Sequence, residues 1–425
     1  MSDFLNLQDA ALAVARTFPW YKQLLREAGN GAARPPLLTA SRLEPYDAHE
    51  AEPAASEPCT VYRTSGTSSG RRRTIRYSAA DEQRYIEIKS AMFRSWLTAG
   101  GVFPMPVRTV LSDMGTGHAA ATAPDVFRSM GLQVEAVPYS LPIGQHLERI
   151  RSSRPDVLYT MPSLLERIVR HLEQPSRHGI RKVILVGEIA TPSWQRRIAD
   201  RLGIAEADML DTYGSIEIGT IASYSHVHRR YVIAEGLQAE AVPAEELDEG
   251  FDPLPPNERV LVLTSFVREA FPAVRYVTYD VVRDFRPIRI DGVIRQSFAC
   301  IVKRIGPELK HGEKISLYDI EEAVLQHAPD AVIHAAIRDR RLTIHVASRQ
   351  LTDDQLPAVR EAVESRIPEI GAMIRGGLLE RIEVTLAADE AGEPFARTGS
   401  GMQTGMKTRK IHYPAPSADR GADPE

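Results

Sequence analysis

Cysteine is scarce in this sequence: its 425 residues include two, Cys59 and Cys300. Two cysteines so far apart exclude a disulfide framework and a zinc site built from cysteine pairs. The sequence also lacks an apolar run of about 18 residues, which a membrane-spanning helix needs. The first residues do not have the pattern of a signal peptide. We therefore expect a cytoplasmic protein that does not associate with a membrane.

Charge of one sign is not in excess either, since 52 Lys and Arg residues oppose 56 Asp and Glu residues. Nucleic-acid-binding proteins usually carry a basic surplus. We therefore expect no nucleic-acid partner and favour a small molecule whose charges are met locally. Hydrophobic residues make up 43% of the chain, which is ample for a sizeable core. At about 150 residues per domain, the length predicts two or three domains.

The pattern of apolar residues changes along the chain. Between residues 105 and 235, short β-like runs alternate with helical stretches, which predicts βαβ units and a mostly parallel sheet. Residues 231–300 are β-rich, and the pattern beyond Arg304 is typical of an α+β domain. The fold class is therefore α/β, with a β-rich subdomain in the large domain. The predicted domains are residues 1–303, the small domain 304–413 and a disordered tail, 414–425.

A cluster of small polar residues, Thr64-Ser-Gly-Thr-Ser-Ser-Gly70, is the most informative stretch. Such a loop after a strand exposes backbone N–H groups and hydroxyls, which can surround phosphate oxygens. It is not a Walker loop, because no Gly-Lys-Ser or Gly-Lys-Thr follows. From composition alone, a flexible surface loop is the alternative interpretation.

This cluster resembles the phosphate loop of the adenylate-forming superfamily, which includes acyl-CoA synthetases, nonribosomal-peptide adenylation domains and luciferases. Residues 19–29 and 37–43 resemble the phenylacetate-CoA ligase branch in particular. Further segments follow in the family's order, so that the resemblance spans nearly the whole chain. These segments are Gly187-Glu188, Asp211-Thr-Tyr-Gly-Ser-Ile-Glu217, Arg275-Tyr-Val-Thr-Tyr-Asp280, Arg304 through Glu322, and Gly405-Met-Lys-Thr-Arg-Lys410.

The resemblance implies ATP and Mg²⁺ as cofactors. Tyr213 would stack on adenine, Asp280 and Arg304 would contact the ribose, and Glu217 would hold Mg²⁺ as a catalytic residue. Lys407 would stabilise charge as the acyl phosphate forms, although Lys410 stays an alternative. The residues that the resemblance assigns to ATP are Thr64, Ser65, Gly66, Thr67, Ser68, Gly70, Gly187, Glu188, Asp211, Tyr213, Gly214, Ser215, Asp280 and Arg304.

The implied reaction has two halves, with a mobile small domain that rotates between them. A small carboxylic acid, aromatic or of modest size, becomes an acyl-AMP. The acyl group then passes to CoA, a carrier-protein thiol, an amine or another nucleophile, in specialised biosynthesis. Candidate pocket residues follow from their position at strand ends, although each can also serve packing alone. They are Asp113, Gly115, Gly117, His118, Tyr159 and Met161.

Some positions depart from the family pattern. Ile216 stands where the family usually has a hydroxyl residue, and Tyr279 stands where it has glycine. These departures predict a divergent member. A non-catalytic relative, which binds nucleotide or acyl adenylate as a sensor or scaffold, is the alternative hypothesis. The presence of Glu217, Asp280 and Lys407 favours the enzyme.

Overall fold

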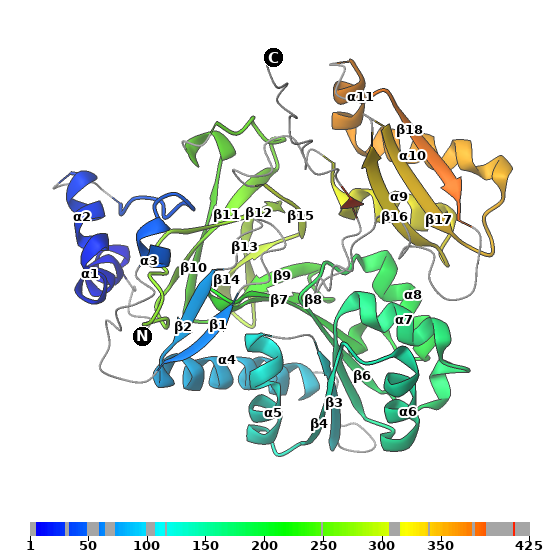
Figure 1. Cartoon of the computed structure of the whole chain (residues 1–425), viewed down its shortest axis with the longest axis horizontal. Coiled ribbons are helices and arrows are strands. Elements are labelled where there is room, and N and C mark those ends of the chain that lie inside the picture. The colour runs from blue at the N-terminus through cyan, green and yellow to red at the C-terminus, as the bar shows by residue number, and fades with distance from the viewer. Residues whose placement is uncertain are drawn as a thin grey trace, which may run out of the picture. The chain divides into compact units, whose positions relative to one another are not determined.

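The computed structural model of the chain describes residues 6–29, 34–48, 59–63, 73–98, 107–114, 117–247, 250–305, 315–338, 341–375, 379–387 and 411–412. These residues form two compact units (Figure 1). The first takes the described residues of 1–190 and 195–310, and the second takes 191–194 and most of those beyond 311. The division at residue 304 stays a prediction, and the tail 414–425 lies outside the described residues. Among the helices that are described, none is long and apolar enough to cross a bilayer.

Short helices open the first unit: α1 (Leu7–Thr17), α2 (Pro19–Glu27) and α3 (Glu44–Ala48). Helix α1 begins after Asn6, whose Oδ1 accepts a hydrogen bond from the Gln8 amide at 2.9 Å, as asparagine often does at an N-cap. Helix α2 begins at Pro19, which lacks the amide hydrogen that a first helical residue would leave unpaired.

The parallel half of the largest sheet arises from strands that alternate with helices. These elements are α4 (Ala79–Thr98), β3 (Thr109–Met114), α5 (His118–Ser129), β4 (Gln133–Pro138), α6 (Ile143–Ser153), β5 (Val157–Thr160), α7 (Pro162–His171), β6 (Lys182–Val186), α8 (Pro192–Leu202) and β7 (Met209–Ser215). The strands lie in the order β4-β3-β5-β6-β7 and pair in parallel. Figure 1 shows α4 and α5 on one side of these strands, with α6 and α7 on the other. The predicted βαβ alternation is confirmed.

Aromatic packing holds α4 and α5 against these strands. The Phe93 and Phe127 rings lie 5.5 Å apart, and the Phe127 ring meets the Tyr159 ring edge-on at 5.4 Å. All three side chains are almost completely buried. Such ring pairs contribute about 0.5–1.5 kcal/mol each beyond their buried area. The contacts therefore fix α4 above β5 at the level of Tyr159.

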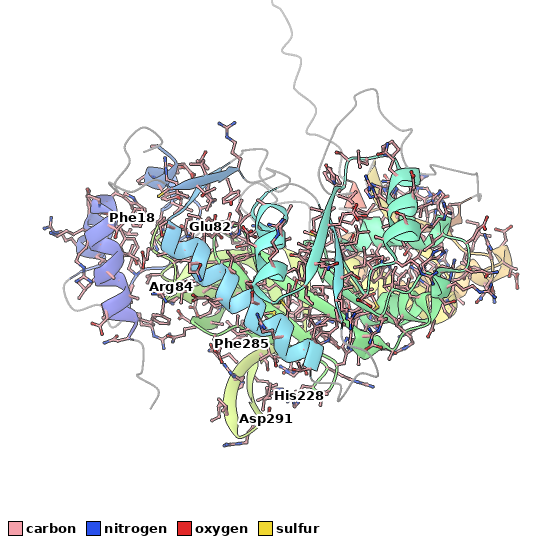
Figure 2. The ribbon with its side chains drawn as sticks, turned by 90° about the horizontal axis from the view of Figure 1, so that it is seen from below. Phe18, Glu82, Arg84, His228, Phe285 and Asp291 are labelled. Carbon is pink, nitrogen blue, oxygen red and sulfur yellow. The ribbon has the colours of Figure 1, made fainter. Side chains whose placement is uncertain are left out.

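Antiparallel strands extend the same sheet beyond β7. They are β8 (Gly219–Ser225), β9 (Arg230–Ile233), β13 (Arg286–Ile290) and β14 (Val293–Phe298), in the order β7-β8-β9-β14-β13. Figure 2 shows Asp291 at the tip of the β13–β14 hairpin, which extends away from the rest of the unit. The α/β fold class is confirmed, and the large sheet is mixed because the predicted β-rich segment joins it.

A second, antiparallel sheet takes the rest of that segment. Its strands are β10 (Leu237–Val242), β11 (Glu258–Ser265), β12 (Tyr276–Arg283) and β15 (Cys300–Arg304), in that order. The β12–β15 register places Asp280 opposite Arg304. A separate hairpin consists of β1 (Thr60–Arg63) and β2 (Thr74–Tyr77). The predicted phosphate loop follows β1 in the chain and lies outside the described residues.

The second unit is built on its own sheet. Its elements are α9 (Leu317–His327), β16 (Val332–Arg338), β17 (Arg341–Ala347), α10 (Leu356–Arg366), α11 (Pro368–Arg375), β18 (Arg381–Leu386) and β19 (Ile411–His412). The strand order is β18-β17-β16-β19. Helix α9 begins after its N-cap Ser316, which accepts a hydrogen bond from the Asp319 amide at 3.1 Å. Helix α11 is short and directly follows α10.

Strand β7 has no room for a side chain at Gly214, where it pairs with β8. A Cβ atom there would lie 2.6 Å from the Gly219 carbonyl oxygen. We expect Gly214→Ala to lower the free energy of unfolding by about 1–3 kcal/mol, because the strands must move apart. Gly144→Ala is the matched control, because its Cβ meets no atom within 4 Å in α6 and alanine favours a helix. Denaturant unfolding of both variants checks this, and equal effects would contradict it.

Candidate active site

The candidate site lies at the edge where β3, β5, β6 and β7 end. Parallel strands present their carboxyl ends together, and open α/β sheets bind ligands at this edge. The registers place these ends side by side, with Asp113 opposite Thr160 and Thr160 opposite Leu185. The predicted site residues at or just after these ends are Asp113, Gly117, His118, Tyr159, Met161, Gly187, Glu188, Tyr213, Gly214 and Ser215.

Three of the predicted nucleotide residues meet in one cluster. The Tyr213 hydroxyl donates a hydrogen bond to Asp280 Oδ2, and the Arg304 guanidinium lies 3.9 Å from Asp280 Oδ1. Burial and the neighbouring Asp280 carboxylate raise the pKa of Tyr213 well above its ordinary value, so the hydroxyl stays a donor. The structure therefore brings together residues that the sequence places in three separate segments.

Glu217 lies in the turn between β7 and β8, shortly after Tyr213 in the chain. Its side chain is half-buried. Its charge acts on Tyr276 and Arg304, whose pKa values the carboxylate helps to raise. Among the residues that the structure describes, none forms a hydrogen bond or ion pair with the carboxylate itself. Glu217 is thus available to a ligand.

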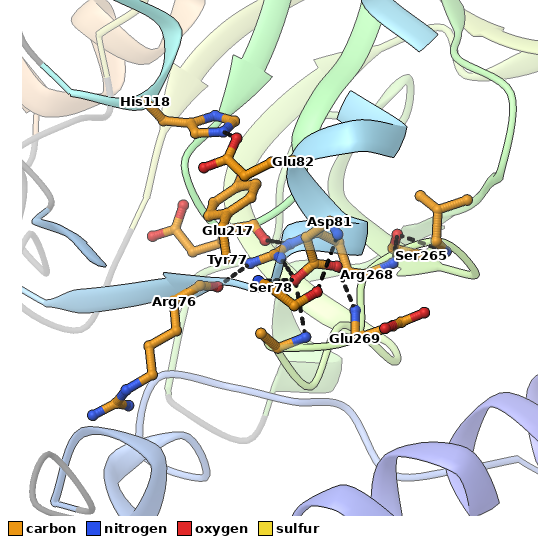
Figure 3. A network of polar contacts seen from close by, with 12 residues as sticks. Arg76, Tyr77, Ser78, Asp81, Glu82, His118, Glu217, Ser265, Arg268 and Glu269 are labelled. Carbon is orange, nitrogen blue, oxygen red and sulfur yellow. Dashed lines mark hydrogen bonds and ion pairs between the residues drawn. The ribbon is translucent and has the colours of Figure 1, made fainter. Parts of the chain in front are cut away.

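Arg268 holds the turn that carries Glu217, and Figure 3 shows its contacts. Its Nε donates to the Glu217 carbonyl oxygen at 3.0 Å, and a second nitrogen donates to the Arg76 carbonyl oxygen at 2.9 Å. A third nitrogen pairs with the fully buried Asp81 carboxylate. The guanidinium also stacks 3.8 Å from the Tyr77 ring centroid. One cation therefore links β2, the first turn of α4 and the β7–β8 turn.

The Gly187-Glu188 turn follows β6. Gly187 has a φ of 86°, in the left-handed region that favours glycine. The Glu188 carboxylate accepts hydrogen bonds from the Ser163 amide and hydroxyl, at 2.7 and 2.8 Å. Ser163 belongs to the first turn of α7, so Glu188 satisfies a free amide at a helix N-terminus. This contact fixes the turn, and contact with adenine stays a prediction.

Asp211 and Ser215 differ in what their side chains face. The Asp211 carboxylate is 1% exposed and accepts a hydrogen bond from the Tyr231 hydroxyl. Burial raises the pKa of Asp211 to about 7. Its carboxylate therefore faces the protein interior, although the sequence places it in the nucleotide segment. Ser215 Oγ accepts a hydrogen bond from the Ile218 amide at 3.2 Å and stabilises the β7–β8 turn.

His118, at the start of α5, is enclosed by aromatic rings. Its ring stacks 3.8 Å from the Tyr77 ring and lies 4.2 Å from the Tyr85 ring. Its Nε2 lies 2.8 Å from Glu82 Oε2, and Tyr62 donates to the other Glu82 oxygen at 2.9 Å. Burial lowers the pKa of His118, which favours the neutral ring. Gly117, directly before it, has a φ of 97°.

The remaining predicted pocket residues are buried. The Asp113 carboxylate is 2.8 Å from Nδ1 of the buried His146, so it faces a protein partner. Tyr159 and Met161 belong to the aromatic core beneath α4. A Cβ at Gly187 would lie 4.0 Å from Met161 Cγ, which places Met161 beside the turn after β6.

Several predicted residues lie outside the described residues, so their roles stay predictions. They are Thr64, Ser65, Gly66, Thr67, Ser68, Gly70, Gly115 and Lys407.

A curated relative shares much of this sequence. The chain is 35% identical over 386 residues to the fumarate–(S)-2,3-diaminopropanoate ligase of Enterobacter agglomerans, a match that covers 89% of this chain and 94% of the relative. The chain belongs to the family of this ligase. The family model described as the fumarate–diaminopropanoate ligase C-terminal domain also matches residues 310–389.

Solved structures of adenylate-forming ligases share the fold. A 2-hydroxyisobutyryl-CoA ligase in its postadenylation state aligns with a TM-score of 0.70 at 14% identity, covering 95% of this chain and 87% of that one. The same enzyme in complex with 2-HIB-AMP and CoA aligns with a TM-score of 0.57 at 16% identity and the same coverage. The predicted superfamily is thus confirmed. The chain is an enzyme, an adenylate-forming ligase that activates a carboxylic acid with ATP and transfers the acyl group to a nucleophile.

Sequence reasoning missed the polar residues of this ligase that lie inside the first unit. Arg268, Glu82 and Lys89 all have polar atoms in or beside the aromatic layer between α4 and the sheet. Lys89 could have been found, because it stands on the helix face of the buried Tyr85 and Phe93, four residues from each. A charged residue within an apolar helix face indicates a functional or structural role for that residue.

We expect Arg268→Met to lower the free energy of unfolding by about 3–5 kcal/mol, because it leaves the buried Asp81 carboxylate without its cation. Arg128→Met is the matched control, because Arg128 and Asp125 form an exposed ion pair, of the kind that contributes about 1 kcal/mol or less. Denaturant unfolding measures both. A similar small loss in the two variants would show that Arg268 does not hold this region together.

The raised pKa of Asp211 predicts that the stability of the protein depends on pH. Folding raises its pKa from 3.8 to about 7, so the folded state binds this proton more tightly than the unfolded chain. Stability should therefore fall as the pH rises between those values, by at most about 1.4 kcal/mol per pH unit. Asp211→Asn keeps an acceptor for Tyr231 and removes the buried charge. We expect its melting temperature to change less than that of the unaltered enzyme between about pH 4 and 7. The exposed Asp291→Asn should leave the slope unchanged, and an unchanged slope in Asp211→Asn would contradict the assignment.

Proposed function

We propose that this ligase joins fumarate, or a similarly short dicarboxylic acid, to an amino group of a small amino acid such as (S)-2,3-diaminopropanoate. The relative with 35% identity is named for this reaction, and the match spans most of both chains, which supports the proposal. The family model over residues 310–389 carries the name of the same ligase, which also supports the proposal. The product is an amide, of the kind that specialised biosynthesis uses.

In the first half-reaction, a carboxylate oxygen of the acid attacks the α-phosphorus of ATP, and pyrophosphate leaves with the electrons of the broken P–O bond. We assign the cluster of Tyr213, Asp280 and Arg304 to the nucleoside of ATP, because these three side chains meet in the structure. Asp280 would accept hydrogen bonds from ribose hydroxyls in place of the Tyr213 hydroxyl, which would free the tyrosine ring for adenine. The loop Thr64–Gly70 would surround the phosphates.

Glu217 fits the role of a magnesium ligand. It is a hard oxygen donor without a protein partner among the described residues, and Mg²⁺ prefers such donors. No group of three or more His, Cys, Asp and Glu residues in that part of the chain could hold a metal by itself. The ion would therefore be shared with phosphate oxygens, where it would offset the negative charge of the pyrophosphate.

In the second half-reaction, the neutral amine attacks the acyl carbon, the bond to AMP breaks, and the amine nitrogen loses a proton. Lys407, or its neighbour Lys410, would serve the first half by stabilising charge on the α-phosphate. Rotation of the small domain would then remove it. CoA or a carrier thiol is the competing acceptor.

We expect fumarate to support exchange of labelled pyrophosphate into ATP. Addition of (S)-2,3-diaminopropanoate should then give stoichiometric AMP and an amide that mass spectrometry detects. We expect Asp280→Ala to lower kcat/KM for ATP by about 10- to 100-fold, because hydrogen bonds to charged groups are lost. The exposed Asp291→Ala, at the hairpin tip in Figure 2, is the matched control and should leave the rate unchanged.

Two outcomes would contradict the proposal. One is a fumaryl thioester that forms with CoA while the amine gives no amide. The other is an absence of pyrophosphate exchange when fumarate or a related short diacid is the acid.

A further inference from the structure

Lys89 is a buried cation without a counter-ion among the residues that the structure describes. The residue is 5% exposed, and its ammonium donates a hydrogen bond to the Tyr85 hydroxyl at 2.7 Å. Within the part of the chain that the structure describes, no carboxylate forms an ion pair with it. The other buried cationic side chains there each pair with a carboxylate: Lys182 with Asp208, Arg230 with Asp284, and Arg268 with Asp81.

Aromatic rings surround this ammonium. It lies 5.0 Å from the Tyr85 ring centroid, 5.5 Å from that of Tyr159 and 5.8 Å from that of Phe93. These cation–π contacts offset part of the cost of removing the ion from water, but they supply no counter-ion. A lysine ammonium has three N–H donors: the Tyr85 hydroxyl accepts from one, the Tyr159 oxygen lies beside the ammonium as a second neutral partner, and no described carboxylate takes the third.

The Tyr159 hydroxyl lies beside it. The hydroxyl is buried, its oxygen faces the Lys89 ammonium, and no described residue accepts its proton. Burial raises the pKa of Tyr159, so the hydroxyl keeps its proton and cannot act as the counter-ion. Buried polar groups in native proteins are rarely left unsatisfied. An ammonium and a hydroxyl that both need acceptors, in one apolar layer, match the chemistry of a carboxylate.

These groups lie near the carboxyl ends of the strands, where the candidate site is. Tyr159 is near the carboxyl end of β5, and Met161 follows it beside the Gly187 turn. The Tyr85 ring connects Lys89 to His118, which lies at the start of α5 after the carboxyl end of β3. The flat rings of Tyr85, Phe93 and Tyr159 would pack well on a short, planar carbon skeleton.

We propose that the Lys89 ammonium, with the Tyr159 hydroxyl, binds a second carboxylate of the acid that the enzyme activates, and so selects dicarboxylic over monocarboxylic acids. The inference rests on the proposed function in that the acid enters the site for adenylation. Of the two carboxylates, the one held by Lys89 is kept from reaction and orients the other toward ATP. The long, flexible lysine side chain can move to meet the ligand.

The test compares fumarate with crotonate, in which a methyl group replaces the second carboxylate. We expect the unaltered enzyme to favour fumarate by about 100-fold in kcat/KM of pyrophosphate exchange, because a buried charge rejects an analogue that leaves it unpaired. Lys89→Met keeps the shape of the side chain without its charge. We expect it to lose about 100-fold on fumarate and to stay within about threefold on crotonate. The Kd for ATP should not change, which excludes a phosphate as the anion that Lys89 binds.

Two further variants separate this role from packing. Tyr159→Phe removes one hydroxyl, and we expect about a tenfold loss on fumarate with little change on crotonate. Lys182→Met is the matched control, because Lys182 is also a buried lysine but lies at the amino end of β6, away from the ligand edge. It should leave the ratio of fumarate to crotonate unchanged. Circular dichroism and thermal unfolding check that each variant folds, and we expect Lys89→Met to melt no lower than the unaltered enzyme.

The outcomes distinguish this inference from the proposed function. If Lys89→Met and Tyr159→Phe both fold and keep the preference for fumarate, the inference is overturned while the ligase reaction stands. If the unaltered enzyme activates succinate or maleate but not fumarate, fumarate is the wrong acid, and the same variants decide the role of Lys89 with that diacid. If it activates monocarboxylic acids alone, Lys89 does not select a second carboxylate.

Discussion

The ion pair of Arg268 and Asp81 organises the first unit around the candidate site. Asp81 also accepts hydrogen bonds from the amides of Glu269 and Ala270, so the buried carboxylate is well satisfied. A buried ion pair contributes little net stability unless its remaining hydrogen bonds are made, and here they are. The Tyr77 hydroxyl donates to the Ile216 carbonyl oxygen at 2.8 Å, one residue before the Glu217 carbonyl that Arg268 binds. The turn that presents Glu217 is therefore held at two successive carbonyls.

Much of the parallel half could be predicted from the sequence, because its signals are local. Apolar runs of strand length alternate with helical periodicity between residues 105 and 235, and the structure has alternating strands and helices there. The order of the motifs indicated the superfamily, and through it Tyr213, Asp280 and Arg304, which the structure brings into one cluster. The prediction of this cluster came from the family resemblance, because no local sequence pattern indicates that three segments so far apart in the chain are in contact.

Contacts between distant residues could not be predicted in this way. Arg268 stands 187 residues from Asp81, and no pattern around either indicates the other. Asp211 follows the family motif, yet its carboxylate faces Tyr231 in the interior because side chains alternate between the faces of a strand. The antiparallel strands were expected as a β-rich segment, but their division between two sheets depends on pairings that composition does not encode.

Tyr279 shows what a departure from the family pattern does to this backbone. It has a φ of 62°, a conformation in which glycine is the ordinary choice, and its hydroxyl accepts a hydrogen bond from the Ala40 amide at 2.7 Å. The buried ring packs with Phe251 and so ties the strand that carries Asp280 to the segment around residue 40. A tyrosine restricts the backbone far more than glycine would. The carboxylate assigned to the ribose is thus preorganised, and this strand would lose less conformational entropy when ATP docks than a glycine-containing strand would.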